Sequence, residues 1–218
     1  SIRRRQRQMC IRDSYQSGAL SFEIIRNGQK LISNCGYFNG ENTKLNEISK
    51  STATQSTLII DDYSSCKIDN SSNINQGLKI LKKNTVFEKN YWKIIAAHDG
   101  YLKKYNSIHE REIEFYPEQM TFVGMDKIIK KRENHNYKFD IRFHLEPGVK
   151  LMKTQDNKTI LLELNDEGWE FSCDNFDINI DNGLYFGNKN SYVNNQNIFI
   201  TGISGNQIEN IRWHLKKI

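Results

Sequence analysis

The stretch "KFDIRFHL", residues 138–145, decides the fold class. Apolar side chains recur at every second position, and charged or polar side chains stand between them. A period of two with aromatic and β-branched residues is typical of a β-strand, because successive side chains of a strand point to opposite faces of the sheet. The stretch therefore predicts a half-buried strand, with Phe139, Ile141, Phe143 and Leu145 on one face and Lys138, Asp140, Arg142 and His144 on the other.

The same pattern recurs along most of the chain. The run "HEREIEFY", residues 109–116, alternates in the same way and places Glu110, Glu112 and Glu114 on a predicted solvent-facing side. The turn "RNGQ", residues 26–29, lies between two apolar runs, and an Asn-Gly pair in that setting is a strong signal for a tight hairpin. Many short strands joined by polar turns predict an all-β fold, a large antiparallel β-sandwich of two stacked sheets.

Little helix is expected. No stretch holds a helical period over three turns, and only "TKLNEISKSTA", residues 43–53, could form one short helix. The chain of 218 residues has no linker, repeat or sharp change of composition after its first residues. We therefore interpret residues 15–218 as one domain.

Residues 1–14 are interpreted separately. They hold five arginines and one aspartate, so the rest of the chain keeps 26 basic and 25 acidic residues. The run "RRQRQMCIRD" reads, codon by codon, like a sequencing adapter translated in frame, and we expect it to be non-native. The alternative is a genuine basic arm, which would be a solvated tail. Because the positive charge lies almost wholly in this segment, the remainder has no general attraction for nucleic acid.

The cysteines predict neither a metal site nor a disulfide framework. Without Cys10, which lies in the first segment, three widely spaced cysteines remain, and their number is odd. We expect Cys35, Cys66 and Cys173 to be buried as small apolar residues.

The densest group of candidate site residues is "AAHDGYLKKYNSIHER", residues 96–111. It follows one predicted strand, crosses a connection and enters the next strand. A histidine or tyrosine can act as a general base, and arginine pairs with a carboxylate or sulfate through two hydrogen bonds. The predicted catalytic residues are His98, Tyr101 and His109, and the predicted substrate-binding residues are Asp99 and Arg111.

A structural interpretation of the same residues stays open. His98 and Asp99 could shape a turn, and Arg111 could pair with the neighbouring Glu110 or Glu112. Outside this cluster, we expect His144 to be a hydrogen-bonded strand histidine. Trp92, Trp169 and Trp213 lie inside strand patterns, so core packing is expected for them rather than sugar stacking. The sequence contains no phosphate-binding glycine loop, no GxSxG and no HExxH.

Short motifs along residues 15–218 resemble the C-terminal region of heparinase II/III-like proteins, of the type found in alphaproteobacteria. The resemblance rests on an ordered set: "LSFE", "ISNCG", "TATQSTLIIDDYSS", "AAHDGY", "HERE", "DIRFHLEPGV", "LLELNDEGWEF", "LYFG" and "IRWHLKK". It implies a β-sandwich that follows an N-terminal α/α toroid, missing from this chain. It also implies β-elimination of a uronic-acid-containing, acidic polysaccharide, and a location in the bacterial cell envelope or periplasm.

The resemblance also implies where a metal would bind. Zinc-binding members have a His-x-His-x-Asp pattern just before the segment that matches "LSFE", in which the first His is catalytic and the second binds zinc. These positions hold Ser14, Gln16 and Gly18 here. Two further positions hold Asn34 and Gln55. Because zinc prefers thiolate, imidazole and carboxylate ligands, we expect no zinc and no other cofactor.

Two functions remain open at this point. The first is the C-terminal domain of a polysaccharide lyase, which we expect to be inactive by itself without the toroid. The second is a non-catalytic carbohydrate-binding or structural sandwich. We expect neither nucleic-acid binding nor a membrane span, since no apolar run approaches the about 20 residues that a spanning helix needs.

Overall fold

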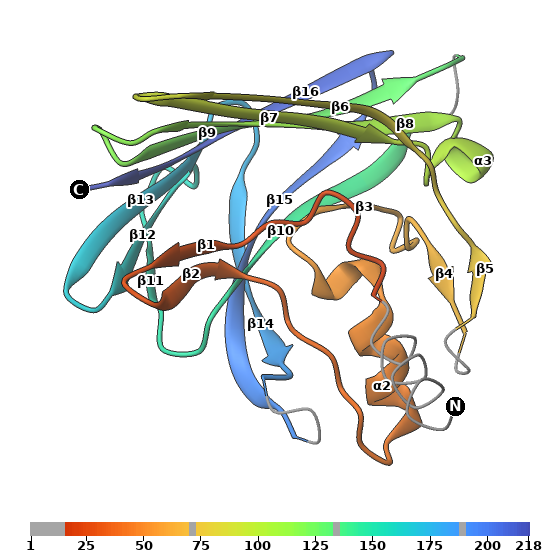
Figure 1. Cartoon of the computed structure of the whole chain (residues 1–218), viewed down its shortest axis with the longest axis horizontal. Helices are drawn as coiled ribbons and strands as arrows, with labels where there is room; N and C mark the ends of the chain where they lie inside the picture. The colour runs from red at the N-terminus through yellow and green to blue at the C-terminus, as the bar shows by residue number, and fades with distance from the viewer. Residues whose placement is uncertain (1–15, 70–72, 133–135, 188–190) are drawn as a thin grey trace.

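Two antiparallel sheets form the fold in the computed structural model, which describes residues 16–69, 73–132, 136–187 and 191–218 (Figure 1). Residues 1–14, interpreted above as non-native, lie outside the described residues. The smaller sheet has six strands in the described part: β1 (Ile24–Arg26), β2 (Gln29–Ser33), β3 (Leu58–Ile60), β10 (Tyr137–Leu145), β14 (Ile178–Tyr185) and β15 (Val193–Ser204). The all-β sandwich expected from the sequence is confirmed.

The larger sheet has eight strands in the described part of the chain. Their spatial order is β11-β12-β13-β16-β9-β8-β7-β6. Their bounds are β6 (Ile80–Glu88), β7 (Tyr91–His98), β8 (Ser107–Tyr116), β9 (Thr121–Lys130), β11 (Lys150–Lys153), β12 (Thr159–Leu164), β13 (Glu167–Cys173) and β16 (Ile208–Lys217). A third, two-stranded ribbon joins β4 (Lys67–Ile68) to β5 (Ile74–Gln76).

The helices are short, as expected. The predicted segment forms α2 (Thr43–Lys50) followed by a 3-10 turn at Thr52–Thr54. Asn42 caps α2, because its side-chain oxygen accepts a hydrogen bond from the backbone N–H of Leu45. α3 (Leu102–Tyr105) lies between β7 and β8 and ends at Asn106 in the left-handed conformation. Among the described residues, no helix is long and apolar enough to cross a membrane.

β10 supplies the centre of the core, because it pairs with β2, β3 and β15. The predicted apolar face is confirmed, and Phe139, Ile141 and Phe143 are fully buried. The opposite face differs from the expectation of a half-buried strand, because Asp140 and His144 are also buried. The segment that leads into β3 covers His144, whose backbone N–H donates to the Ser56 hydroxyl.

The predicted hairpin at "RNGQ" is present between β1 and β2. Asn27 and Gly28 both have positive φ, 51° and 80°, as a two-residue turn of this kind requires. The glutamates of β8 lie on the outer face of the larger sheet, but lysines partly cover them. Glu110 is only 8% exposed and pairs with Lys82 and Lys127.

Two of the three tryptophans pack in the core as expected. Trp169 and Trp213 are fully buried, and Trp213 stacks on Phe22 with ring centroids 5.6 Å apart. The expectation is wrong for Trp92, which is 45% exposed. Trp92 lies on β7, one strand from the edge of the larger sheet. Its ring contacts that of Phe87 on the edge strand β6.

The cysteines follow the expectation in part. Cys35, Cys66 and Cys173 are free thiols, and Cys35 and Cys173 are buried. Cys66 is only partly buried, so burial as a small apolar residue is wrong for this position. Cys10 lies outside the described residues.

Candidate functional site

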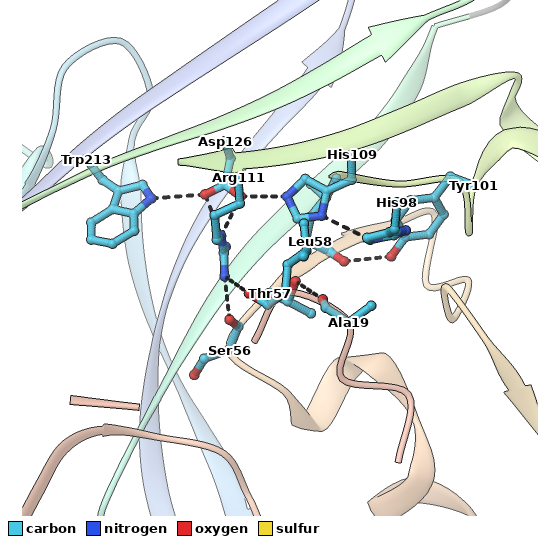
Figure 2. A network of polar contacts seen from close by, with 11 residues as sticks. Ala19, Ser56, Thr57, Leu58, His98, Tyr101, His109, Arg111, Asp126 and Trp213 are labelled. Carbon is cyan, nitrogen blue, oxygen red and sulfur yellow. Dashed lines mark hydrogen bonds and ion pairs between the residues drawn. The ribbon is translucent and has the colours of Figure 1, made fainter. Parts of the chain in front are cut away.

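The polar cluster predicted from the sequence lies where β7 ends and β8 begins. His98, the last residue of β7, pairs with His109 across the two strands, and Ala96 pairs with Arg111. Because these positions are two residues apart on each strand, the side chains of His98, His109 and Arg111 share one face of the sheet. That face carries the core, so the three polar side chains point into the interior (Figure 2).

Asp126 on β9 is the centre of this cluster. Its carboxylate accepts hydrogen bonds from Arg111 Nε at 2.7 Å and Nη2 at 3.1 Å, and from His109 Nε2 at 2.6 Å. The indole Nε1 of Trp213 donates to the same carboxylate at 3.0 Å. The four side chains are at most 3% exposed. We call Asp126, Arg111, His109, His98 and Trp213 the Asp126 network.

The contacts of the two histidines define one arrangement of protons. The backbone N–H of Gly100 donates to His98 Nδ1 at 3.0 Å, so the proton of a neutral His98 lies on Nε2. His98 Nε2 then donates to His109 Nδ1 at 3.2 Å, and His109 Nε2 donates to Asp126. Both rings satisfy their hydrogen bonds while neutral, and no extra proton is needed.

Burial explains the pKa values in the network. Burial, together with the nearby Arg111 charge, lowers the pKa of His98 to about 3. Burial also lowers the pKa of His109, although Asp126 acts in the opposite direction. For Asp126 burial acts to raise the pKa, but Arg111 and His109 outweigh it and hold the pKa well below its usual range. At neutral pH the network therefore holds two neutral imidazoles around one ion pair.

The network ties the larger sheet to segments that lead into the smaller one. Arg111 Nη1 donates to the backbone carbonyls of Leu20 at 2.9 Å and Ser56 at 2.7 Å. The hydroxyl of Tyr101 donates to the carbonyl of Leu58 at 2.6 Å (Figure 2). Burial raises the pKa of Tyr101 far above its usual range, so the phenol keeps its proton and this contact. The polar side chains thus hold the backbone before β1 and the entry into β3.

The structure brings together four of the five residues predicted for the site. His98, Tyr101, His109 and Arg111 lie together, and all four are buried. Asp99 instead accepts the backbone N–H of Lys79 at 2.6 Å and holds the start of β6 against the end of β7. No sugar could touch the four buried groups without displacing described residues, so their catalytic and substrate-binding roles stay predictions.

Sequence reasoning missed Asp126, although the pattern carried a signal. In "MTFVGMDKI", residues 120–128, Asp126 lies an even number of positions from Phe122, Gly124 and Ile128. It therefore shares their inward face of the strand. A carboxylate at a core position of a strand needs a buried partner. Arg111 is that partner, rather than pairing with Glu110 or Glu112 as the structural interpretation had it.

Carboxamides occupy the positions where the resemblance implies zinc ligands. Gln16 Nε2 donates to the backbone carbonyls of Gly36 at 2.6 Å and Ser49 at 2.8 Å. Asn34 Oδ1 accepts the backbone N–H of Ser56 at 2.8 Å.

Gln55 and Gly18 occupy the remaining described positions of that set. Gln55 Nε2 donates to Thr54 Oγ1 at 3.3 Å, and a Cβ at Gly18 would lie 2.7 Å from Gln55 Oε1. Within the described residues, no group of three or more His, Cys, Asp or Glu side chains could hold a metal ion. The amides are engaged with the protein itself, and this donor set does not fit zinc. Ser14 lies outside the described residues.

His144 is a hydrogen-bonded strand histidine, as expected. Its Nε2 donates to the carbonyl of Ala53 at 2.9 Å, so Nδ1 is free to accept the thiol of Cys35 at 3.1 Å. Burial lowers the pKa of His144 to about 4 and raises that of Cys35 to about 12. Both groups are therefore neutral at physiological pH, and the pair is not an activated nucleophile.

Comparison with known proteins shows which proteins share this fold. A family profile described as heparinase II/III-like, C-terminal, matches residues 11–214. The heparan sulfate lyase HepC from Pedobacter heparinus superposes with a TM-score of 0.76 at 15% identity, over 93% of this chain and 30% of that chain. The structure titled heparinase III-BT4657 gene product gives a TM-score of 0.74 at 14% identity, with the same two coverages. No curated protein matches the chain.

The chain thus spans less than a third of the solved lyase chains that it resembles. At this level of identity the solved structures establish the fold alone. The family profile covers more than nine tenths of the chain. On that basis the protein belongs to the heparinase II/III-like C-terminal family.

Proposed function

We propose that this chain is the C-terminal β-sandwich of a polysaccharide lyase that cleaves a uronic-acid-containing polysaccharide by β-elimination. The observation that carries the proposal is the family match over residues 11–214. The shared fold with heparan sulfate lyase HepC, over 93% of this chain, supports it. The solved lyases are about three times longer than the matched part, and we propose that the whole protein likewise has a further domain.

The chemistry needs groups that reach the sugar. The uronate carboxylate must be neutralised so that the proton on C5 becomes acidic, a base must remove that proton, and the departing glycosidic oxygen must be protonated. The Asp126 network and Tyr101 are buried and satisfied within the protein. We therefore propose positioning roles for His98, His109 and Arg111. Through Arg111 they hold the segments around Leu20 and Ser56 against the larger sheet. Side chains outside the Asp126 network would contact the sugar.

The chain by itself should not turn over polysaccharide. The test is ultraviolet absorbance of newly formed unsaturated uronates on heparan sulfate, alginate and related polymers. We expect no signal from the 218-residue chain and a signal from the protein extended by its upstream domain. Turnover by the chain alone would contradict the proposal that cleavage needs the upstream domain. No turnover by the extended protein on any acidic polysaccharide would overturn the lyase proposal.

A second function is a non-catalytic carbohydrate-binding or structural sandwich. The carboxamides at Gln16, Asn34 and Gln55 favour it, because they stand where zinc-binding members of the family have ligands. The sequence of the gene upstream of Tyr15 separates the two functions. A helical region with inward-facing Tyr, Asn and His supports the lyase, and its absence supports the binding module.

The proposal also includes the cellular location of the protein, its ligand, its cofactors and its partners. Family resemblance supports the cell envelope or periplasm and an acidic polysaccharide as ligand. The absence of a cofactor is supported instead by Gln16, Asn34 and Gln55, which replace the ligands of zinc-binding members. The near balance of charge outside residues 1–14 supports the absence of a nucleic-acid partner. Fractionation of cells that produce the extended protein tests the location. Recovery in the cytoplasmic fraction would contradict it.

A further inference from the structure

One free edge of the larger sheet is formed by β6, which runs along the top of the view in Figure 1. Among the described residues, β6 has β7 as its one ladder partner, and no strand pairs with its other side. Backbone N–H and C=O groups of an antiparallel strand point alternately to its two sides, so about half of those of β6 face this edge. Such a row of unpaired groups is a template for pairing with another strand.

β6 is long and regular for an edge strand. It has nine residues and contains no proline, a residue that often prevents pairing at sheet edges. Its register with β7 shifts only between Ile80 and Lys82, so residues 82–88 run without a bulge. All of these residues are exposed except Val86, which is partly buried. The segment 82–88 therefore offers an accessible, regular edge to a second strand.

The inner face of this edge is apolar. Phe87 is 65% exposed, and Trp92, its cross-strand partner on β7, is 45% exposed. The rings of Phe87, Trp92 and Phe115 are neighbours on three successive strands. Phe115 in turn stacks on Phe122 of β9, with ring centroids 4.3 Å apart. This aromatic row runs from the core to the free edge, and exposed apolar side chains gathered in this way are typical of protein–protein contact.

The charges of β6 decide what can pair with it. Lysines on an edge strand oppose pairing when like charges would meet across the new ladder, and β6 carries Lys82 and Lys83. It also carries one carboxylate, Glu88, which makes no ion pair within the described part of the chain. Lys82 and Glu88 are six positions apart, so they share the outer face of the sheet. A second β6 strand can therefore supply a carboxylate to Lys82 and an ammonium group to Glu88.

One register of two antiparallel β6 strands matches these charges. A twofold axis perpendicular to the sheet pairs residues of the same face, so the axis must pass through one residue of the strand. With the axis at Thr85, Lys82 of each copy lies opposite Glu88 of the other copy. On the inner face, Lys83 then lies opposite Phe87, where its ammonium group can contact the aromatic ring.

The neighbouring registers do not match the charges. An axis at Lys83 places that lysine opposite its own copy, and an axis at Val86 places Lys83 opposite Lys89. An axis at Asn84 leaves every charged residue of β6 opposite an uncharged one. Axes closer to the ends of the strand pair shorter segments. The charge pattern of β6 is thus complementary to itself in the register centred on Thr85.

We propose that a second copy of this chain pairs with β6, so that two larger sheets join edge to edge through residues 82–88. The dimer contains two Lys82–Glu88 pairs, one on each side of the axis. An ammonium group has three donors, so Lys82 can bind Glu88 of the second copy and keep Glu110, which is 2.9 Å away. The inference goes beyond lyase chemistry, because the dimer forms whether or not the longer protein cleaves a polymer.

Sedimentation velocity of the 218-residue chain over a range of concentrations tests the dimer. We expect a monomer–dimer equilibrium with a micromolar dissociation constant, as suits a small interface. Lys82→Glu and Glu88→Lys should each weaken dimerisation about tenfold, because like charges then meet twice. Glu110 keeps Lys127 at 3.0 Å in both variants. A chain that stays monomeric at about 1 mM overturns the proposal.

A mixture of the two charge variants separates pairing from a general effect of charge. Lys82→Glu and Glu88→Lys should dimerise with each other about as well as the unaltered chain does with itself, because each variant carries the charge that the other needs. Glu163→Lys, on β12 at the other end of the larger sheet, is the control and should leave dimerisation unchanged. A mixture that dimerises no better than either variant alone overturns the proposal.

Cross-linking tests the register. Thr85→Cys should form a covalent dimer under mild oxidation, because residues directly opposite in an antiparallel pair have Cβ atoms about 4.5–5.5 Å apart. Asn84→Cys is the matched control, since Asn84 lies opposite Val86 and not its own copy, and it should cross-link at least about fivefold less. The unaltered chain gives the background from its own cysteines. Equal cross-linking of the two variants, or of neither above the background, would overturn the proposal.

Discussion

Arg111 on β8 and Asp126 on β9 form a two-pronged ion pair in the interior, with Nε–Oδ1 and Nη2–Oδ2 distances of 2.7 and 3.1 Å. The third nitrogen of the same guanidinium reaches two backbone carbonyls, of Leu20 and Ser56, in segments that lead into the other sheet. The Arg111–Asp126 ion pair within the larger sheet thus orients the hydrogen bonds from Arg111 to the segments that lead into the smaller sheet. Arginine suits this place, because its planar group offers donors in several fixed directions.

Removal of the carboxylate should destabilise the protein strongly. Asp126→Asn leaves the buried Arg111 without its counter-charge, and we expect a loss of about 3–5 kcal/mol in the free energy of unfolding. Urea denaturation followed by circular dichroism measures it. Asp174→Asn is the control, because Asp174 is a half-exposed carboxylate paired with His214, and a change within about 0.5 kcal/mol is expected there. Equal losses in the two variants would contradict a structural role for the Asp126 network.

Acid should destabilise the fold before the carboxylates titrate. His98 and His144 have folded-state pKa values lowered to about 3 and about 4, and that of His109 is lowered as well. The unfolded chain binds these protons near pH 6.5 and the folded chain does not, so stability is full above about pH 6.5 and falls as the pH drops toward the folded values. Each histidine contributes about 1.4 kcal/mol per pH unit in that window.

Urea denaturation at a series of pH values tests this slope. We expect a steep fall between about pH 6.5 and about pH 5, and little change between about pH 7 and about pH 8. His98→Asn should reduce the slope by the share of one histidine. A free energy of unfolding that stays level from about pH 7 to about pH 5 would show that the buried rings take up protons in the folded state.

A methyl group at Gly124 should disturb the core. A Cβ there would lie 2.0 Å from ring atoms of Trp213, its cross-strand partner, and Trp213 also donates to Asp126. Gly124→Ala should therefore cost about 1–3 kcal/mol, as overpacking of a core does. Thermal denaturation measures the loss. Gly205→Ala is the control, since nothing lies within 4 Å of a Cβ at that position. A neutral Gly124→Ala would mean that the indole can move without loss.

Zinc should not bind to the amide positions. After incubation with zinc and dialysis, we expect well under one metal ion per chain by elemental analysis, because Gln16, Asn34 and Gln55 offer no thiolate, imidazole or carboxylate. The triple variant Gln16→His, Gly18→Asp and Gln55→His supplies such ligands and should retain zinc. One equivalent of zinc on the unaltered chain would contradict this account of the site.

The alternation of side chains made the strands predictable. In "KFDIRFHL" the period of two identifies the strand and its core face without any knowledge of its partners. The Asn27–Gly28 turn and the short helix at Thr43–Lys50 were equally local, because a turn or a cap depends on residues a few positions apart. His98, His109 and Arg111 could be grouped from the sequence for the same reason, since one hairpin connection separates them.

What the sequence could not reveal depended on which strands become neighbours. Asp126 meets Arg111 because β9 pairs with β8, and Trp213 joins them because β16 pairs with β9. Trp92 shares the alternation of a core residue, yet it is exposed because its strand lies near the edge of the larger sheet.

By itself, the sequence determined the all-β class, the strand faces, the hairpin and the family. Only the tertiary structure decided that the conspicuous His-Tyr-Arg cluster is buried, and that Asp126 on β9 pairs with Arg111 on β8. The physical reason is the range of the interactions. Strand periodicity and turn geometry are encoded within a few residues, whereas burial and strand pairing arise from contacts between segments up to about a hundred residues or more apart.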